Sequence, residues 1–213
     1  MDKQNKLKMI KCPRCGSVDT AEILYGLPAF DDELAALLDA GRIHLGGCCR
    51  SGFDPRYYCN TCQKSFGATA VTRDGINYER FAEIVTEVHF SRTAARSMFN
   101  SYEITVKRTK NGAHVYSDGM TDHLLFYDDC DTSSKRWARL VSKLYDSLFL
   151  SDWKHTFKPV GYSVLDGESW RLEIKMTGNR KRTYSGDNAY PPYWRELDRL
   201  MRSVTKPMKI GMY

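Results

Sequence analysis

The sequence predicts an α+β protein in two parts: a small cysteine-rich domain, then an antiparallel sheet covered on one side by two helices. Two Cys-x-x-Cys pairs mark the first part. Alternation of apolar and polar residues marks strands in the second part, and helical periodicity follows each of two groups of strands. We expect the domains to cover residues 1–73 and 74–213.

The cysteine pairs, Cys12 with Cys15 and Cys59 with Cys62, have the spacing of ligands for one tetrahedral Zn²⁺. A small module buries little apolar area, so metal binding would supply much of its folding free energy. Catalytic zinc sites keep an open position and usually include His or a carboxylate, whereas four cysteines are expected here. The pattern therefore predicts a structural zinc ion.

Three further cysteines, Cys48, Cys49 and Cys130, have no assigned role. Cys48 or Cys49 can replace a zinc ligand, or both can be partly buried small apolar residues. The vicinal pair can also be redox-active, although no neighbouring residue is arranged to lower a thiol pKa. Unpaired thiols behind an N-terminus without an export signal favour a cytoplasmic protein. No apolar stretch has the length of a transmembrane helix, so we expect no membrane partner.

Between the cysteine pairs, residues 21–26 favour a strand, and residues 33–40 favour a helix. Asp31 or Asp32 is the expected N-cap, and Gly41 suits the C-terminal end.

Four motifs of this region resemble a zinc-ribbon segment found in uncharacterised bacterial proteins. They are Cys12-Pro13-Arg14-Cys15-Gly16, Tyr25-Gly26-Leu27-Pro28, Leu45-Gly46-Gly47-Cys48, and Asp54-Pro55 before Tyr58-Cys59-Asn60-Thr61-Cys62. The resemblance covers roughly residues 10–67. It implies a small metal-stabilised domain and no reaction.

Strands and helices alternate in groups in the second part. Residues 84–90, 102–107 and 123–127 favour strands, with Ile84 on the inner face of the first. Asn111-Gly112 favours a hairpin turn because it accepts positive φ. A strongly periodic helix should then cover the sheet with an inner stripe of Trp137, Leu140, Val141, Leu144 and Leu148, capped by Thr132 or Ser133.

The second group of strands is expected at residues 160–165, 170–176 and 181–186. Pro191 and Pro192 should open the last helix, whose inner stripe is Trp194, Leu197, Met201 and Val204. The motifs Trp170-x-Leu172-x-Ile174 and Gly186-Asp187-Asn188-Ala189-Tyr190-Pro191-Pro192-x-Trp194-x-x-Leu197 resemble bacterial domains of unknown function. This resemblance supports the element order and implies no activity.

Three groups of polar residues are candidate sites. Asp128, Asp129 and Asp131 can hold Mg²⁺ or Mn²⁺ for a metal-dependent hydrolase, or can form an acidic loop before a helix. The residues Arg171, Lys175, Arg180, Lys181 and Arg182 form either a nucleic-acid-binding stripe on a hairpin or a solvated strand face. Asn188 and Tyr190 can present a binding surface, or residues 187 and 188 can cap the last helix.

The net charge of +6 is mild, so it permits an anionic partner without requiring one. We expect a non-enzymatic, zinc-stabilised binding module that contacts a protein or another macromolecule. The first alternative is a nucleic-acid-binding protein that uses the cysteine knuckles and the 171–182 hairpin. The second is the hydrolase built on the acidic cluster.

Overall fold

The computed structural model describes residues 10–72, 78–94, 100–121, 124–161, 167–205 and 208–209. Strands dominate, and helices follow the strand groups, so the α+β class is confirmed. The expected domain boundary after residue 73, His123 and most of the expected strand at 160–165 lie outside the described residues. Within the described ranges, no helix has the length and apolar character needed to cross a membrane.

The cysteine-rich part is a four-stranded sheet with the order β2-β1-β3-β4. Its strands are β1 (Thr20–Leu24), β2 (Ile43–Leu45), β3 (Tyr57–Cys59) and β4 (Lys64–Phe66). Helix α1 (Asp32–Asp39) connects β1 to β2, which run parallel. The Asp31 side chain caps α1 by accepting a 2.8 Å hydrogen bond from the Leu34 N–H, and Gly41 follows the helix with φ of 62°.

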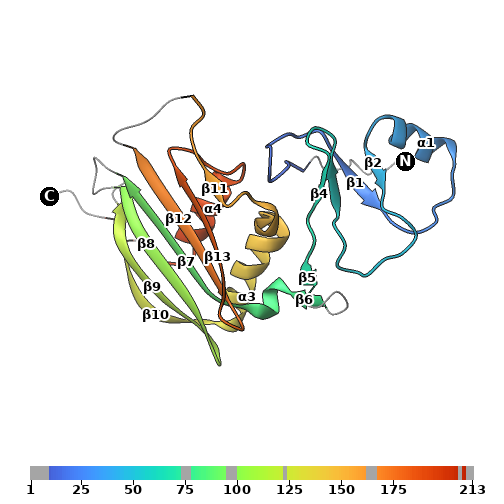
Figure 1. The fold of residues 1–213 in the computed structure, drawn as a ribbon. Coiled ribbons are helices and arrows are strands. Elements are labelled where there is room, and N and C mark those ends of the chain that lie inside the picture. The colour runs from blue at the N-terminus through green and yellow to red at the C-terminus, as the bar shows by residue number, and fades with distance from the viewer. Residues whose placement is uncertain are drawn as a thin grey trace.

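A short antiparallel pair, β5 (Ala70–Thr72) and β6 (Tyr78–Arg80), follows this sheet and leads into α2 (Phe81–Ile84). Figure 1 shows this pair between the cysteine-rich part and the large sheet.

The large sheet has the order β11-β13-β12-β7-β8-β9-β10-β14. The strands are β7 (Val85–Ala94), β8 (Asn100–Thr109), β9 (Gly112–Thr121), β10 (Leu124–Ser133), β11 (Thr156–Phe157), β12 (Glu168–Met176), β13 (Arg180–Asp187) and β14 (Met208–Lys209). All neighbours are antiparallel except β11 and β13. Because β12 pairs with β7, the two predicted groups of strands join into one sheet.

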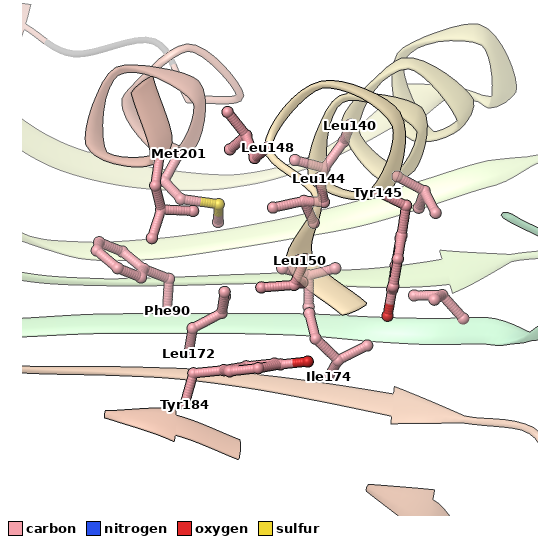
Figure 2. Packing of buried hydrophobic residues seen from close by; sticks show 14 of the residues in the cluster. Phe90, Leu140, Leu144, Tyr145, Leu148, Leu150, Leu172, Ile174, Tyr184 and Met201 are labelled. Atoms are coloured by element: carbon pink, nitrogen blue, oxygen red, sulfur yellow. The ribbon is translucent and has the colours of Figure 1, made fainter. Parts of the chain in front are cut away.

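Two helices pack on one face of this sheet, as the sequence predicts (Figures 1 and 2). They are α3 (Ser134–Ser142), which continues into a π-helical turn η1 (Lys143–Ser147), and α4 (Trp194–Arg202). A 3-10 turn η2 (Leu150–Asp152) follows η1. Ser133 is the N-cap of α3, since its hydroxyl accepts a hydrogen bond from the Arg136 N–H.

The core lies between these helices and the strands. Figure 2 shows Phe90, Leu172 and Ile174 pointing from the sheet toward Leu144 and Met201 on the helical side. These five side chains are fully buried. Full burial of one such side chain contributes roughly 2 kcal/mol, so the alternating residues of β12 are a large part of the sheet's stability.

Two expectations about the strands of the large sheet were wrong. Ile84 belongs to α2, and β7 starts at Val85, where the register with β12 shifts by a bulge. Residues 128–133 continue strand β10 instead of forming an acidic loop. They pair with β9 as far as Ser133 opposite Gly112, and these ladder hydrogen bonds outweigh the turn preference of aspartate.

Candidate metal centre and surface sites

The four predicted zinc ligands converge. The Sγ atoms of Cys12, Cys15, Cys59 and Cys62 all lie within 4.8 Å of one another. Two of the distances are 3.8 Å, from Cys12 to Cys62, and 3.6 Å, from Cys15 to Cys59. Zn–S bonds of about 2.3 Å in a tetrahedron require sulfur separations of about 3.8 Å. The quartet therefore has the dimensions of a four-thiolate metal site.

Two tight turns position these sulfurs. The first knuckle closes through a 2.8 Å hydrogen bond from the Cys12 N–H to the Ser17 carbonyl, and Gly16 has φ of 79°. The second closes through a 2.8 Å bond from the Gln63 N–H to the Cys59 carbonyl, and Gln63 has φ of 54°. Antiparallel pairing places Thr20 of β1 opposite Cys59 of β3, and this brings the two turns together.

Burial differs among the four thiols. Cys12 and Cys59 are 0% exposed, Cys62 is half-buried and Cys15 is exposed. Burial raises the pKa of Cys12 to about 12 and also raises the pKa of Cys62. Burial alone would raise the pKa of Cys59 as well. Hydrogen bonds from the Cys62 N–H and the neighbouring thiols outweigh burial, so the pKa of Cys59 is lowered. Cys12 and Cys62 therefore ionise readily only beside a cation, and a set of four thiols fits a thiophilic metal ion.

The second part of the chain supports the first knuckle directly. The Tyr193 hydroxyl donates a 2.5 Å hydrogen bond to the Lys11 carbonyl, next to Cys12. The Lys11 ammonium donates to the Pro192 carbonyl. Burial raises the pKa of Tyr193, so this phenol remains a hydrogen-bond donor at neutral pH. The start of α4 therefore holds the residue that precedes the first ligand.

Phe149 joins the two parts by packing. Its ring contacts Tyr57 and Phe66 of the cysteine-rich sheet edge-on, with centroid distances of 5.8 and 5.3 Å. Asp152 adds polar contacts, since one carboxylate oxygen accepts the Gly67 N–H at 2.9 Å and the other pairs with Arg14 at 3.1 Å. Buried Cys12 and Cys59 thus belong to the same hydrophobic cluster as the core of the large sheet.

The remaining cysteines lie outside the quartet. Cys48 and Cys49 are exposed, with sulfurs 3.7 Å apart, and neither belongs to the converging group. Cys130 is half-buried on β10. Among the described residues, the quartet is the only convergent group of three or more His, Cys, Asp or Glu side chains.

The structure separates the acidic cluster. Asp129 and Asp131 project from the uncovered face of the sheet, where they bind His114 at 2.7 and 3.1 Å. Because successive residues of a strand point to opposite faces, Asp128 points to the helix-covered face, where it lies opposite Ser117. One of its carboxylate oxygens is buried there without a hydrogen-bond partner. The three carboxylates therefore do not converge on one metal position.

Four of the five basic residues of the 171–182 hairpin form ion pairs with glutamates. Arg171 and Lys181 pair with Glu173, Lys175 pairs with Glu87, and Arg180 pairs with Glu79, at N–O distances of 2.6 to 3.2 Å. Arg182 lies on the helix-covered face, with its guanidinium 5.9 Å from the centre of the Phe81 ring. The five cations therefore do not form one uncompensated stripe.

Asn188 and Tyr190 contribute to the structure at the start of α4. The Asn188 side chain accepts a 2.8 Å hydrogen bond from the Glu168 N–H, and Asn188 has φ of 50°. It ties β13 to β12 and does not cap α4, whose N-cap position is Tyr193. Tyr190 is 40% exposed and packs on Trp194 at 4.8 Å.

Sequence reasoning missed a charged network beneath α4. Asp198 accepts a hydrogen bond from the Tyr102 hydroxyl and pairs with Arg92 at 3.3 Å and Arg202 at 2.5 Å. Arg92 also pairs with Glu168 at 2.7 Å. These residues come from four separate elements, so no pattern of spacing in the sequence predicts that they contact one another.

Sequence reasoning also missed an aromatic and acidic surface on β8, β9 and β10. Tyr116 and Tyr127 are 45% and 65% exposed on the uncovered face of the sheet. Glu103 and Asp118 line a hollow of about 330 Å³ beside Tyr116. Cross-strand pairing places Tyr127 opposite Asp118. We refer to these four residues as the open-face patch.

Comparison with protein-family models, curated proteins and solved structures found no match to this chain.

Proposed function

We propose that the chain is a non-enzymatic, zinc-stabilised binding module whose large sheet contacts a basic protein partner. The observation that carries this proposal is the open-face patch, in which exposed tyrosines adjoin carboxylates on a face without covering helices. The cysteine quartet serves as the structural zinc site, in keeping with the bacterial zinc-ribbon segment that the sequence resembles.

The donor set supports zinc as the bound ion. Tetrahedral four-sulfur sites are typical of zinc and of iron in sulfur ligation, and structural zinc sites take all four ligands from the protein. With Cys12, Cys15, Cys59 and Cys62 all bound, no coordination position remains for a substrate. The role of the ion is then to stabilise the fold.

The chemistry of the open-face patch favours cationic side chains. Tyrosine rings attract lysine and arginine through their faces, and carboxylates form charge-assisted hydrogen bonds with the same groups. Tyrosine is also enriched where protein interfaces concentrate their binding energy. In the part of the chain that the structure describes, Asp118 has no ion-pair partner and is available to an arriving cation.

The ion pairs of the 171–182 hairpin favour a protein partner over nucleic acid. Arg171 and Lys181 share Glu173, whose pKa is lowered from its usual range by these two cations against the effect of burial. A phosphate backbone would have to compete with that carboxylate. Binding of nucleic acid also depends steeply on salt, which gives a direct way to separate the two proposals.

A binding assay with three labelled probes tests the proposal: a ten-residue lysine and arginine peptide, a ten-residue glutamate peptide and a ten-nucleotide single strand of RNA. We expect saturable binding of the basic peptide only. Replacing Tyr127→Ala should weaken that binding at least tenfold, because the ring is a central contact. Tyr78→Ala is the matched control, since Tyr78 is 47% exposed on β6, away from the patch.

Tight binding of the RNA strand that weakens steeply with salt would instead establish the nucleic-acid alternative. Equal loss of peptide binding in the Tyr127 and Tyr78 variants would refute the open-face patch as the docking surface.

A further inference from the structure

A cavity of about 190 Å³ lies between α3 and α4 on the helix-covered face of the sheet. Val106 of β8 and Val115 of β9, which are directly paired across the two strands, form its floor. Both valines are fully buried. The cavity therefore extends between the two helices down to the surface of the sheet.

The walls of this cavity are apolar. Trp137 and Leu140 line it from α3, Leu200 lines it from the end of α4, and Val204 lines it from the turn that follows α4. An engineered cavity of about 150 Å³ with similar aliphatic and aromatic walls binds benzene. The volume thus suits one aromatic ring or a short branched chain.

The mouth of the cavity is cationic. Arg136 and Arg139 line it and are exposed to solvent. In the part of the chain that the structure describes, neither guanidinium pairs with a carboxylate. The first turn of α3 contains no acidic residue, although the positive end of a helix favours acidic side chains there. Arg136 and the neighbouring Lys135 therefore stand in an electrostatic environment that an anion would improve.

We propose that this cavity binds a small organic carboxylate. Its compact apolar body lies on Val106 and Val115 between the helices, and its carboxylate pairs with Arg136 and Arg139 at the mouth. Arginine is suited to this task because its planar guanidinium can bind both oxygens of a carboxylate at once. Burial of the apolar body supplies affinity, and the arginines supply selectivity for the anion.

This site is separate from the open-face patch and does not rest on the proposed protein partner. The two lie on opposite faces of the same strands, since Val115 projects to the helices and the next residue of β9, Tyr116, projects to solvent. Either proposal can fail without the other.

Calorimetric titration of the full, zinc-loaded chain with matched probes tests this inference. The probes are 3-phenylpropanoate, 3-phenylpropan-1-ol and 3-phenylpropylamine, which share one apolar body and differ in charge. We expect the carboxylate to bind at least tenfold more tightly than the alcohol, and the amine to bind most weakly. The double variant Arg136→Gln, Arg139→Gln should lose at least tenfold in affinity for the carboxylate, while binding of the alcohol stays unchanged.

Two matched controls complete the test. Lys135→Gln removes an exposed charge from the same turn without touching the cavity, so it should change carboxylate affinity less than twofold. Val204→Phe should abolish binding of both carboxylate and alcohol by filling the cavity. Equal affinity for carboxylate and alcohol, undiminished binding in the double arginine variant, or no saturable binding of 3-phenylpropanoate up to ~10 mM would overturn the inference.

Discussion

At the scale of single residues, His114 on β9 lies beside Asp129 and Asp131 on β10 because the two strands pair, although these residues are far apart in the sequence. Its imidazole lies between Asp129 and Asp131, with Nε2 and Nδ1 each facing one carboxylate. The hydrogen bond to Asp131 and the nearby Asp129 charge raise the pKa of His114 above its ordinary value of 6.5. Two of the three aspartates that the sequence offered as a metal site or an acidic loop thus pair with a histidine side chain.

The pKa of His114 is testable by its pH dependence. Since the folded chain holds the proton more tightly than the unfolded chain, the ion pairs contribute stability fully below pH 6.5. That contribution is lost as pH rises through the folded pKa. We expect Asp131→Asn to bring the His114 pKa back toward 6.5 in an NMR titration, while Asp187→Asn on β13 leaves it unchanged. A wild-type pKa at or below 6.5 would contradict the pairing.

At the scale of elements, the network under α4 anchors that helix to the sheet. Asp198 is 6% exposed and contacts Tyr102 on β8, Arg92 on β7 and Arg202 on α4 itself. Removing one member of a buried ionic group leaves its partners desolvated and unpaired, which is strongly destabilising.

We therefore expect Asp198→Ala to lower the free energy of unfolding by about 3 kcal/mol in a denaturant titration. Glu196→Ala is the control on the same helix, because Glu196 is exposed. Glu196→Ala should lower the free energy of unfolding by no more than about 0.5 kcal/mol, because it removes an acidic residue near the start of the helix. Similar costs for the two variants would show that the network contributes nothing beyond ordinary surface charge.

Elements with strong periodicity were predictable from sequence, and elements set by partners were not. The alternation of Leu172 and Ile174 identified β12 because both side chains must face a core. The composition of residues 128–133 favours a turn, but these residues form a strand because they pair with β9. The cysteine quartet was predictable because its spacing is local within each turn, whereas the Asp198 network and the open-face patch depend on pairing between distant segments.

At the scale of the whole molecule, Phe149 couples the cysteine-rich part to the large sheet. It has φ of 54° and ψ of 43°, a left-handed conformation that non-glycine residues adopt only when the surroundings impose it. Its side chain is buried, and its ring contacts Tyr57 and Phe66 of the cysteine-rich sheet and Tyr193 at the start of α4. Packing of this ring offsets the backbone strain.

We expect Phe149→Ala to lower the free energy of unfolding by about 3 kcal/mol and to raise hydrogen exchange in β3 and β4. Phe30→Ala is the matched control, since Phe30 is 70% exposed, and it should change neither quantity measurably. Unchanged exchange in the Phe149 variant would mean that the two parts do not stabilise each other through this ring.

We propose that Cys12, Cys15, Cys59 and Cys62 together bind one structural zinc ion. X-ray absorption spectroscopy of the purified, zinc-loaded chain tests this proposal most directly. We expect a single shell of four sulfur atoms at about 2.3 Å from zinc. A shell that contains nitrogen or oxygen in place of a sulfur would contradict it, because the metal would then have an incomplete thiolate set and a position open to chemistry.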